Sequence, residues 1–200
     1  MKEYVVVNQG DDKYNELVSY ANRRDDSNLV IVARSEINRK HDSVKPITVR
    51  NGIYFYVAND VEGALVYGMN PTPEEIAIAE SNMADAARIG SIEDMLFGAP
   101  KEIDDYDELD PTLNALTTAS NSNGAGLLYC SAIMHKLKEK FGTEFYIIPS
   151  SIHEVLIVPF NDELNDESVS GIIGAVNSDP ESIDESTYLG DHPWIITDWL

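Results

Sequence analysis

The clearest structural signal in the chain is the stretch Ile47-Thr48-Val49-Arg50-Asn51-Gly52-Ile53-Tyr54-Phe55-Tyr56-Val57. Two runs rich in β-branched and aromatic residues flank the dipeptide Asn51-Gly52. These two residues tolerate the positive φ angles that a type I′ turn requires at both central positions. The stretch therefore predicts a β-hairpin, and with it an antiparallel sheet.

Residues upstream of this hairpin predict two further strands and one helix. The strands lie at 4–7 and at 29–33, and the second is a β-branched run typical of a buried strand. Between them, Asp11 or Asp12 can cap a helix whose apolar residues follow helical spacing. Residues 34–45 are polar and charged and predict a loop.

Helical signals follow the hairpin. Thr72 predicts an N-cap, Pro73 fits the first helical position, and Glu75 completes a capping box. We expect this helix to run to about residue 88. A second capping pattern predicts a short helix over 91–97.

The second half of the chain predicts the order β-β-α-β-β-α-β. The predicted segments are strands 113–118 and 125–129, a helix from 131 to 142, strands 145–148 and 155–158, a helix over 169–176 and a strand at 194–196. The strands at 145–148 and 155–158 are apolar on both faces, which is typical of central strands. The whole pattern predicts an α+β fold, with helices packed on antiparallel sheets.

The length of 200 residues suits one domain over 1–200. An alternative division has two lobes, 1–100 and 112–200, joined by the acidic segment 101–111. Residues 101–110 are the densest acidic run and predict a solvated loop.

Acidic residues dominate the charge, with 35 against 14 basic ones and a net charge of −21. The excess lies mostly in the second half, because residues after Lys140 include 12 acidic and no basic side chains. We therefore expect neither direct nucleic-acid binding nor attraction to anionic membranes. An unknown protein or a cationic ligand is the expected partner.

The compartment is predicted from what the chain lacks. A single cysteine leaves no internal disulfide framework and fits a reducing compartment. No uncharged apolar stretch approaches the roughly 18 residues that a membrane helix needs, and the run at 5–7 is too short for a signal-peptide core. We expect a cytoplasmic protein.

Standard catalytic and cofactor motifs are absent: there is no phosphate loop, GxGxxG, His-Glu-x-x-His, CxxC or Gly-x-Ser-x-Gly. No cofactor and no metal is predicted. The richest cluster of reactive side chains joins a turn at 150–154 with residues near the last strand. Its members are Ser150, Ser151, His153, Glu154, Asp191 and His192. Together they would suit acid–base or metal chemistry, whereas the alternative is a turn that uses them to satisfy its own backbone.

Cys130 is a candidate nucleophile that the sequence does little to support. It falls at a predicted strand-to-helix junction, and no neighbouring residue suggests a catalytic base. Free cysteines are more often small buried hydrophobic residues. We therefore expect a buried thiol here.

One stretch resembles a known family: Tyr146-Ile147-Ile148-Pro149-Ser150-Ser151-Ile152-His153-Glu154-Val155-Leu156-Ile157-Val158-Pro159. It is similar to the signature of an uncharacterised bacterial domain-of-unknown-function family that is common in anaerobic gut bacteria. The resemblance covers about residues 53–195 and is strongest after 113. It implies a fold unit in an intracellular bacterial setting and supplies no mechanism. Cys130-Ser131 stands where the family is expected to have Pro-Gly, which argues against a family nucleophile there.

Three functional hypotheses follow. The leading one is a non-enzymatic binding or protein-interaction module, which would use an exposed apolar patch. The second is a hydrolase or metal-dependent enzyme that uses the cluster at 150–154 with Asp191 and His192. The third is an acidic mimic of nucleic acid, which requires carboxylates spaced like phosphates along one face.

Overall fold

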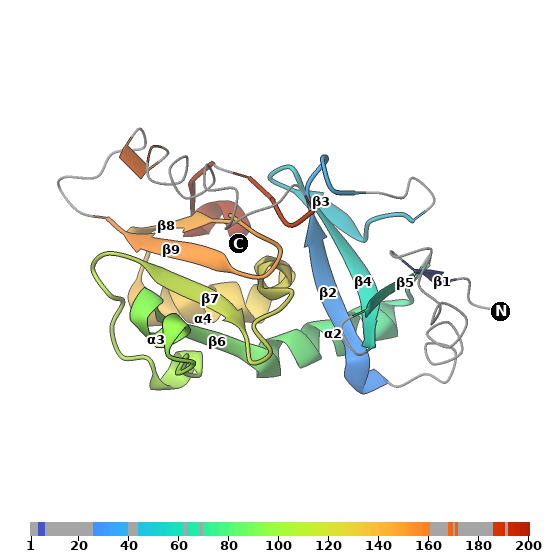
Figure 1. Ribbon diagram of the computed structural model, residues 1–200, viewed down its shortest axis with the longest axis horizontal. Helices are drawn as coiled ribbons and strands as arrows, with labels where there is room; N and C mark the ends of the chain where they lie inside the picture. The colour runs from blue at the N-terminus through green and yellow to red at the C-terminus, as the bar shows by residue number, and fades with distance from the viewer. Residues whose placement is uncertain are drawn as a thin grey trace.

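The structure of the chain is a computed structural model that describes residues 4–6, 26–39, 44–61, 64–68, 70–160, 168–169, 171, 186–190 and 192–200. Its described strands form two five-stranded sheets with helices and 3₁₀ turns packed on them (Figure 1). All the strand pairs are antiparallel. The α+β prediction is confirmed. The expected helices near 11–21 and 169–176 lie largely outside the described residues.

The first sheet contains the hairpin predicted from Asn51-Gly52. Its strand order is β1-β5-β4-β2, and β3 pairs with β4. The strands are β1 (Tyr4–Val6), β2 (Leu29–Arg34), β3 (Thr48–Arg50), β4 (Ile53–Val61) and β5 (Ala64–Gly68). Arg50 pairs with Ile53 across a two-residue turn in which Asn51 has φ 52° and Gly52 has φ 78°. These positive angles are those of the predicted turn type; β5 was not predicted.

The second sheet has the order β10-β8-β9-β7-β6. Its strands are β6 (Ala87–Ser91), β7 (Asn114–Thr118), β8 (Phe145–Ile148), β9 (Val155–Pro159) and β10 (Trp194–Ile195). β8 and β9 each have a neighbour on both sides, as their two apolar faces predicted. One face packs into the main core through Ile147 and Ile157, whereas the other packs through Ile148 and Leu156 into a smaller cluster with Val169.

Helix α2 (Pro73–Ala86) begins as predicted and ends earlier than predicted. Thr72 accepts a hydrogen bond from the backbone of Glu75, whose side chain accepts one in return, so the capping box is present. The predicted helical end at about residue 88 is wrong, because β6 begins at Ala87. Ile89 of β6 is fully buried and pairs with Leu116 of β7, and this tertiary pairing overrides local helix propensity.

The predicted strand at 125–129 is also wrong: residues Gly124–Tyr129 form a 3₁₀ helix, η3. A Cβ atom at Gly126 would lie 2.0 Å from the carbonyl oxygen of Ile31, and one at Gly124 would lie 2.3 Å from that of His153. The segment therefore packs its backbone directly against its neighbours, and five successive residues, 124–128, are buried. An extended strand would alternate its faces instead.

The main hydrophobic cluster draws residues from both sheets, η3, α2 and α4 (Ser131–Phe141). Figure 1 shows α2 passing from the first sheet to β6 of the second. The 3₁₀ helix η4 (Ile196–Trp199) adds Trp199, which is 1% exposed. The carbonyl oxygen of Trp199 accepts a hydrogen bond of 2.7 Å from Arg50 beside the hairpin turn. Among the described helices, none combines the length and apolar character needed to cross a bilayer.

Gly126→Ala tests the close approach of η3 to β2. Because its Cβ would overlap backbone atoms rather than a flexible side chain, we expect a loss of about 3 kcal/mol in the free energy of unfolding. Gly190→Ala is the matched control, since nothing lies within 4 Å of its Cβ position. Urea denaturation followed by circular dichroism measures both, and equal small effects would show that η3 can move away from β2.

Candidate functional site

The predicted cluster at 150–154 lies in the turn between β8 and β9, and its serine hydroxyl groups are buried. Ser151 Oγ accepts hydrogen bonds from the backbone N–H groups of His153, at 3.0 Å, and Glu154, at 3.3 Å. The same hydroxyl donates to Glu154 Oε1 at 3.3 Å. These three bonds use the hydroxyl to close the turn, which leaves it poorly placed as a nucleophile.

The backbone of this turn joins three other segments. Ser151 pairs with Tyr188 in an isolated bridge, and the N–H of Ile152 donates to the carbonyl of Thr187 at 2.9 Å. The carbonyl of His153 accepts from Thr117 Oγ1 at 2.8 Å and from the N–H of Gly124 at 3.0 Å. The turn is a junction between β7, η3 and the segment at 186–190.

The structure describes two further members of the cluster that carry an imidazole, His153 and His192. Burial lowers the pKa of the half-buried His153, the charge of Arg34 lowers it further, and Glu154 opposes both. His192 is exposed and packs edge-on against Trp194, with ring centroids 4.4 Å apart. Asp191 lies outside the described residues. In the part of the chain that the structure describes, no three His, Cys, Asp or Glu side chains are placed to hold a metal ion.

Cys130 is fully buried next to the start of α4. Its sulfur contacts the carbonyl oxygens of Glu80 and Gly126 at 3.8 and 3.9 Å. Burial, helped by the charge of Glu80, raises the pKa of the thiol to about 12. The expected buried thiol is what the structure contains, and a thiolate nucleophile is disfavoured.

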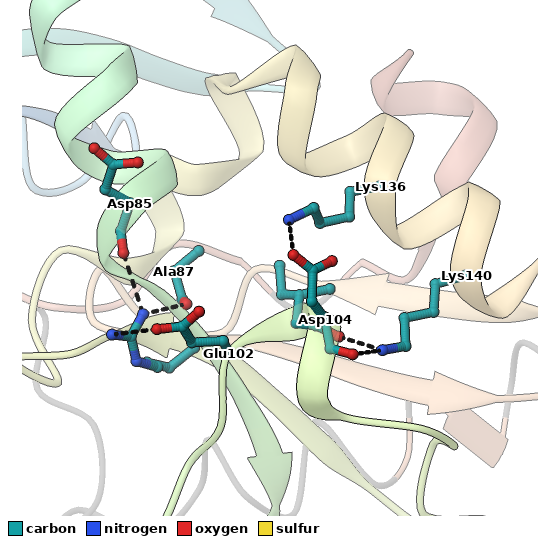
Figure 2. Close-up of polar contacts among 8 residues, drawn as sticks. Asp85, Ala87, Glu102, Asp104, Lys136 and Lys140 are labelled. Atoms are coloured by element: carbon teal, nitrogen blue, oxygen red, sulfur yellow. Dashed lines mark hydrogen bonds and ion pairs between the residues drawn. The ribbon is translucent and has the colours of Figure 1, made fainter.

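A polar pocket of about 330 Å³ lies between the end of α2, the start of β6, residues 102–104 and α4. Figure 2 shows that charged side chains meet across it in pairs. Arg88 lies 3.5 Å from Glu102, and Lys136 Nζ lies 2.8 Å from Asp104. Arg88 also donates to the carbonyl oxygens of Asp85 and Ala87, at 3.2 and 2.8 Å. The cations of the pocket are therefore already paired with acceptors of this chain.

These contacts fasten the acidic segment to the body of the protein. Lys140 Nζ donates to the carbonyl oxygens of Ile103 and Asp104, and Lys101 exchanges two backbone hydrogen bonds of 2.8 Å with Ile89. Ile103 is 3% exposed and belongs to the main core. The hydrogen bond from Lys136 lowers the pKa of the Asp104 carboxyl, and both lysine charges add to this effect.

The predicted solvated loop is thus anchored at its first half. The positions of the basic residues in the sequence indicate this anchoring. All five basic residues beyond Arg50 lie in β6, in α4 or at the start of the acidic run; they are Arg88, Lys101, Lys136, Lys138 and Lys140. Basic residues that cluster beside an acidic run in an otherwise acidic chain favour intramolecular pairing.

An exposed apolar group lies at the end of helix α3 (Ile92–Leu96). The exposed fractions are 38% for Ile92, 77% for Leu96 and 79% for Phe97, and we call these three residues the α3 patch. The helix is held in place by a capping box between Ser91 and Asp94, which the sequence predicted. The patch itself was not predicted.

Carboxylates occur both within α3 and in the segment that follows it. Glu93 and Asp94 lie within the helix, and the acidic segment after Pro100 contains six further carboxylates. Burial raises the pKa of Tyr106, and the charges of Asp94 and Asp110 raise it further, so both carboxylates act on the same phenol. Tyr106 also donates to Asn114 at 2.8 Å, which holds the segment against β7.

The architecture defines the protein as an α+β protein built on two antiparallel sheets that contribute to one main hydrophobic cluster. The chain belongs to a family of unknown function, DUF5688, whose model matches residues 5–195. The match confirms the resemblance to an uncharacterised domain family and begins about 50 residues earlier than the sequence resemblance did. No curated protein and no solved structure matches the chain.

Alkylation of Cys130 tests its burial. At pH 8 a thiol with a pKa near 12 is almost entirely protonated, so iodoacetamide should label the folded protein at least about a thousandfold more slowly than the urea-unfolded protein. Mass spectrometry follows the single adduct. Labelling at similar rates in both states would contradict the burial of the thiol.

Lys136→Met tests the anchoring of the acidic segment. We expect a lower melting temperature at low ionic strength, and a smaller difference from the wild type in about 1 M salt, where the Debye length falls to about 3 Å. Lys138→Met is the matched control, because its ammonium group makes no hydrogen bond or ion pair with the described residues. Identical, salt-independent melting of both variants would contradict the role of Lys136.

Proposed function

We propose that this protein is a non-enzymatic protein-interaction module, and that the α3 patch binds a polypeptide segment rich in apolar and basic side chains. The observation that carries the proposal is the exposure of two adjacent large apolar side chains, Leu96 at 77% and Phe97 at 79%. Single exposed apolar residues are ordinary on protein surfaces, whereas contiguous ones mark interaction sites.

The backbone under the patch is well ordered by local bonds. The N–H of Phe97 donates to the carbonyl of Glu93 at 3.1 Å, and that of Ala99 donates to the carbonyl of Asp94 at 2.8 Å. Between them Gly98 takes φ 69°, a conformation that glycine tolerates best. A patch that is already ordered loses little conformational entropy when a partner binds.

Charge selects the chemistry of the partner. Residues 91–110 contain eight acidic side chains and one basic side chain, Lys101. Lys101 is exposed, as are Glu93, Glu102 and most of the acidic side chains between 104 and 108. A negative field around an apolar centre attracts a positively charged partner and discourages acidic competitors. A segment with apolar anchors and lysine or arginine neighbours fits both features.

The other two hypotheses remain predictions. A hydrolase or metal-dependent enzyme would need Asp191 and His192 to join the turn at 150–154. A nucleic-acid mimic would need a line of carboxylates with phosphate-like spacing. Neither has an observation in the described residues that favours it over the interaction module.

Peptide binding tests the proposal. The probe is a fluorescein-labelled helical peptide of leucine and lysine with one apolar face, and its affinity is measured by fluorescence anisotropy. We expect the double variant Leu96→Ser, Phe97→Ser to bind at least about tenfold more weakly, since buried anchor residues dominate interface energies. Added salt should weaken binding to the wild type.

Controls separate the patch from general stickiness. Ile37→Ser removes another apolar side chain, 63% exposed, that lies outside the patch, and it should leave binding unchanged. A glutamate-for-lysine version of the peptide should not bind. Equal binding by the wild type and the double variant would sink the proposal, as would equal binding of the acidic peptide.

A further inference from the structure

We propose that Arg34 and His153 form a binding site for a small oxyanion, a carboxylate or a phosphate, where the end of β2 meets the β8–β9 turn. The site is separate from the α3 patch. It rests on two buried nitrogen atoms that lack hydrogen-bond partners among the described residues, and on the junction that links the segments carrying them.

The junction is formed around one carbonyl group. Ser35 Oγ and Asn38 Nδ2, which follow β2, donate to the carbonyl oxygen of Tyr188 at 2.9 and 2.7 Å. Tyr188 pairs in turn with Ser151 of the β8–β9 turn. Arg34 precedes Ser35, and the backbone N–H of His153 donates to Ser151 Oγ. The two nitrogen-bearing side chains therefore start from segments that are tied to each other.

Arg34 carries a positive charge without a matching carboxylate among the described residues. Its side chain is 8% exposed, and its Nε donates to the hydroxyl of Tyr67 at 2.9 Å. Its Nη1 is buried and has no hydrogen-bond partner among the residues that the structure describes. Burial raises the pKa of Tyr67, so the phenol is neutral and supplies no counter-charge. A guanidinium group stays charged in proteins, and burying it unpaired is unfavourable.

His153 provides the second half of the site. Its Nδ1 is buried and finds no hydrogen-bond partner in the described part of the chain. Arg34 and Glu154 are the charged groups that act on the imidazole, Arg34 lowering and Glu154 raising its pKa. Buried polar atoms without partners are rare in native structures. Arg34 Nη1 can only donate, so the partner it lacks is an acceptor, and His153 Nδ1 lacks an acceptor as well in the tautomer that carries its proton there.

An oxyanion supplies what both groups lack. Its negative charge offsets the guanidinium, and its several oxygen atoms can accept from Arg34 Nη1 and from an N–H of His153 at the same time. A chloride ion has the charge and offers no fixed array of acceptors. Because the protein carries a net charge of −21, its overall field opposes anions, so binding must come from local contacts of this kind.

Proton NMR of the histidine ring signals tests the site. The His153 signals are assigned with His153→Gln, and the wild type is titrated with phosphate, acetate and chloride at constant ionic strength. We expect phosphate or acetate to give a saturable shift and to raise the titration midpoint of His153, while chloride gives neither. Arg34→Met should weaken the oxyanion affinity by about tenfold or more, because it removes charged hydrogen bonds.

Thermal unfolding provides a second measurement that is independent of the histidine signal. A ligand that binds the folded state raises the melting temperature, so phosphate should stabilise the wild type more than it stabilises Arg34→Met or His153→Gln. In chloride alone, Arg34→Met should be as stable as the wild type or more stable, since it removes a buried unpaired charge. An oxyanion affinity that is unchanged in Arg34→Met, or no shift of His153 with either oxyanion, would overturn the proposal. If Arg34→Met does not fold, loss of the phosphate effect in His153→Gln decides the question.

Discussion

The close approach of η3 to its neighbours is the constraint on which the rest of the structure depends. Neither Gly124 nor Gly126 has room for a side chain, because the backbones of His153 and Ile31 occupy that space. η3 therefore connects β2 of the first sheet with the β8–β9 turn of the second. Leu127 and Leu128, both fully buried, then enter the main core between the sheets and helices. The turn at 150–154 is held against η3 by the hydrogen bond from the N–H of Gly124 to the carbonyl of His153. Within the turn, the hydroxyl of Ser151 accepts from backbone N–H groups.

Features set by a few neighbouring residues could be predicted from the sequence, and features set by distant contacts could not. The Asn51-Gly52 hairpin and the two capping boxes depend on residues within four positions of each other, and all were predicted. The predictions for β6 and η3 were wrong because their conformations depend on distant parts of the chain. Ile89 pairs with β7, and Gly126 packs against β2. The α3 patch was missed for the same reason: exposure of Leu96 depends on which elements pack around it.

Basic residues are few in this chain, so their positions determine which of the many carboxylates are paired. Lys136 and Lys140 hold one half of the acidic run, with Arg88 nearby, and thereby bury Ile103 in the core. Other exposed carboxylates of this region, such as Asp105 and Asp107, form no ion pair with the described residues, and they set the chemistry of the proposed partner. Arg34 is the reverse case, a buried cation far from this arrangement in sequence. The acidic excess behind the net charge of −21 therefore includes carboxylates that anchor a segment and carboxylates that we propose face a partner, whereas Arg34 is a buried charge of the opposite sign.

The contact between Arg50 and Trp199 also has a consequence for the rate of folding, because it joins residues far apart in the sequence. The two residues are 149 positions apart, and the contact between Gly126 of η3 and Ile31 of β2 joins residues 126 − 31 = 95 positions apart. Proteins dominated by such contacts fold slowly, because loop-closure entropy is lost before the contacts form. The hairpin depends on local residues and can form early, whereas its apolar face is buried only after Trp199 and η3 pack in the main core. We therefore expect the joining of the two sheets to be the slow step of folding, and the surfaces still exposed before it to be the ones most prone to aggregation.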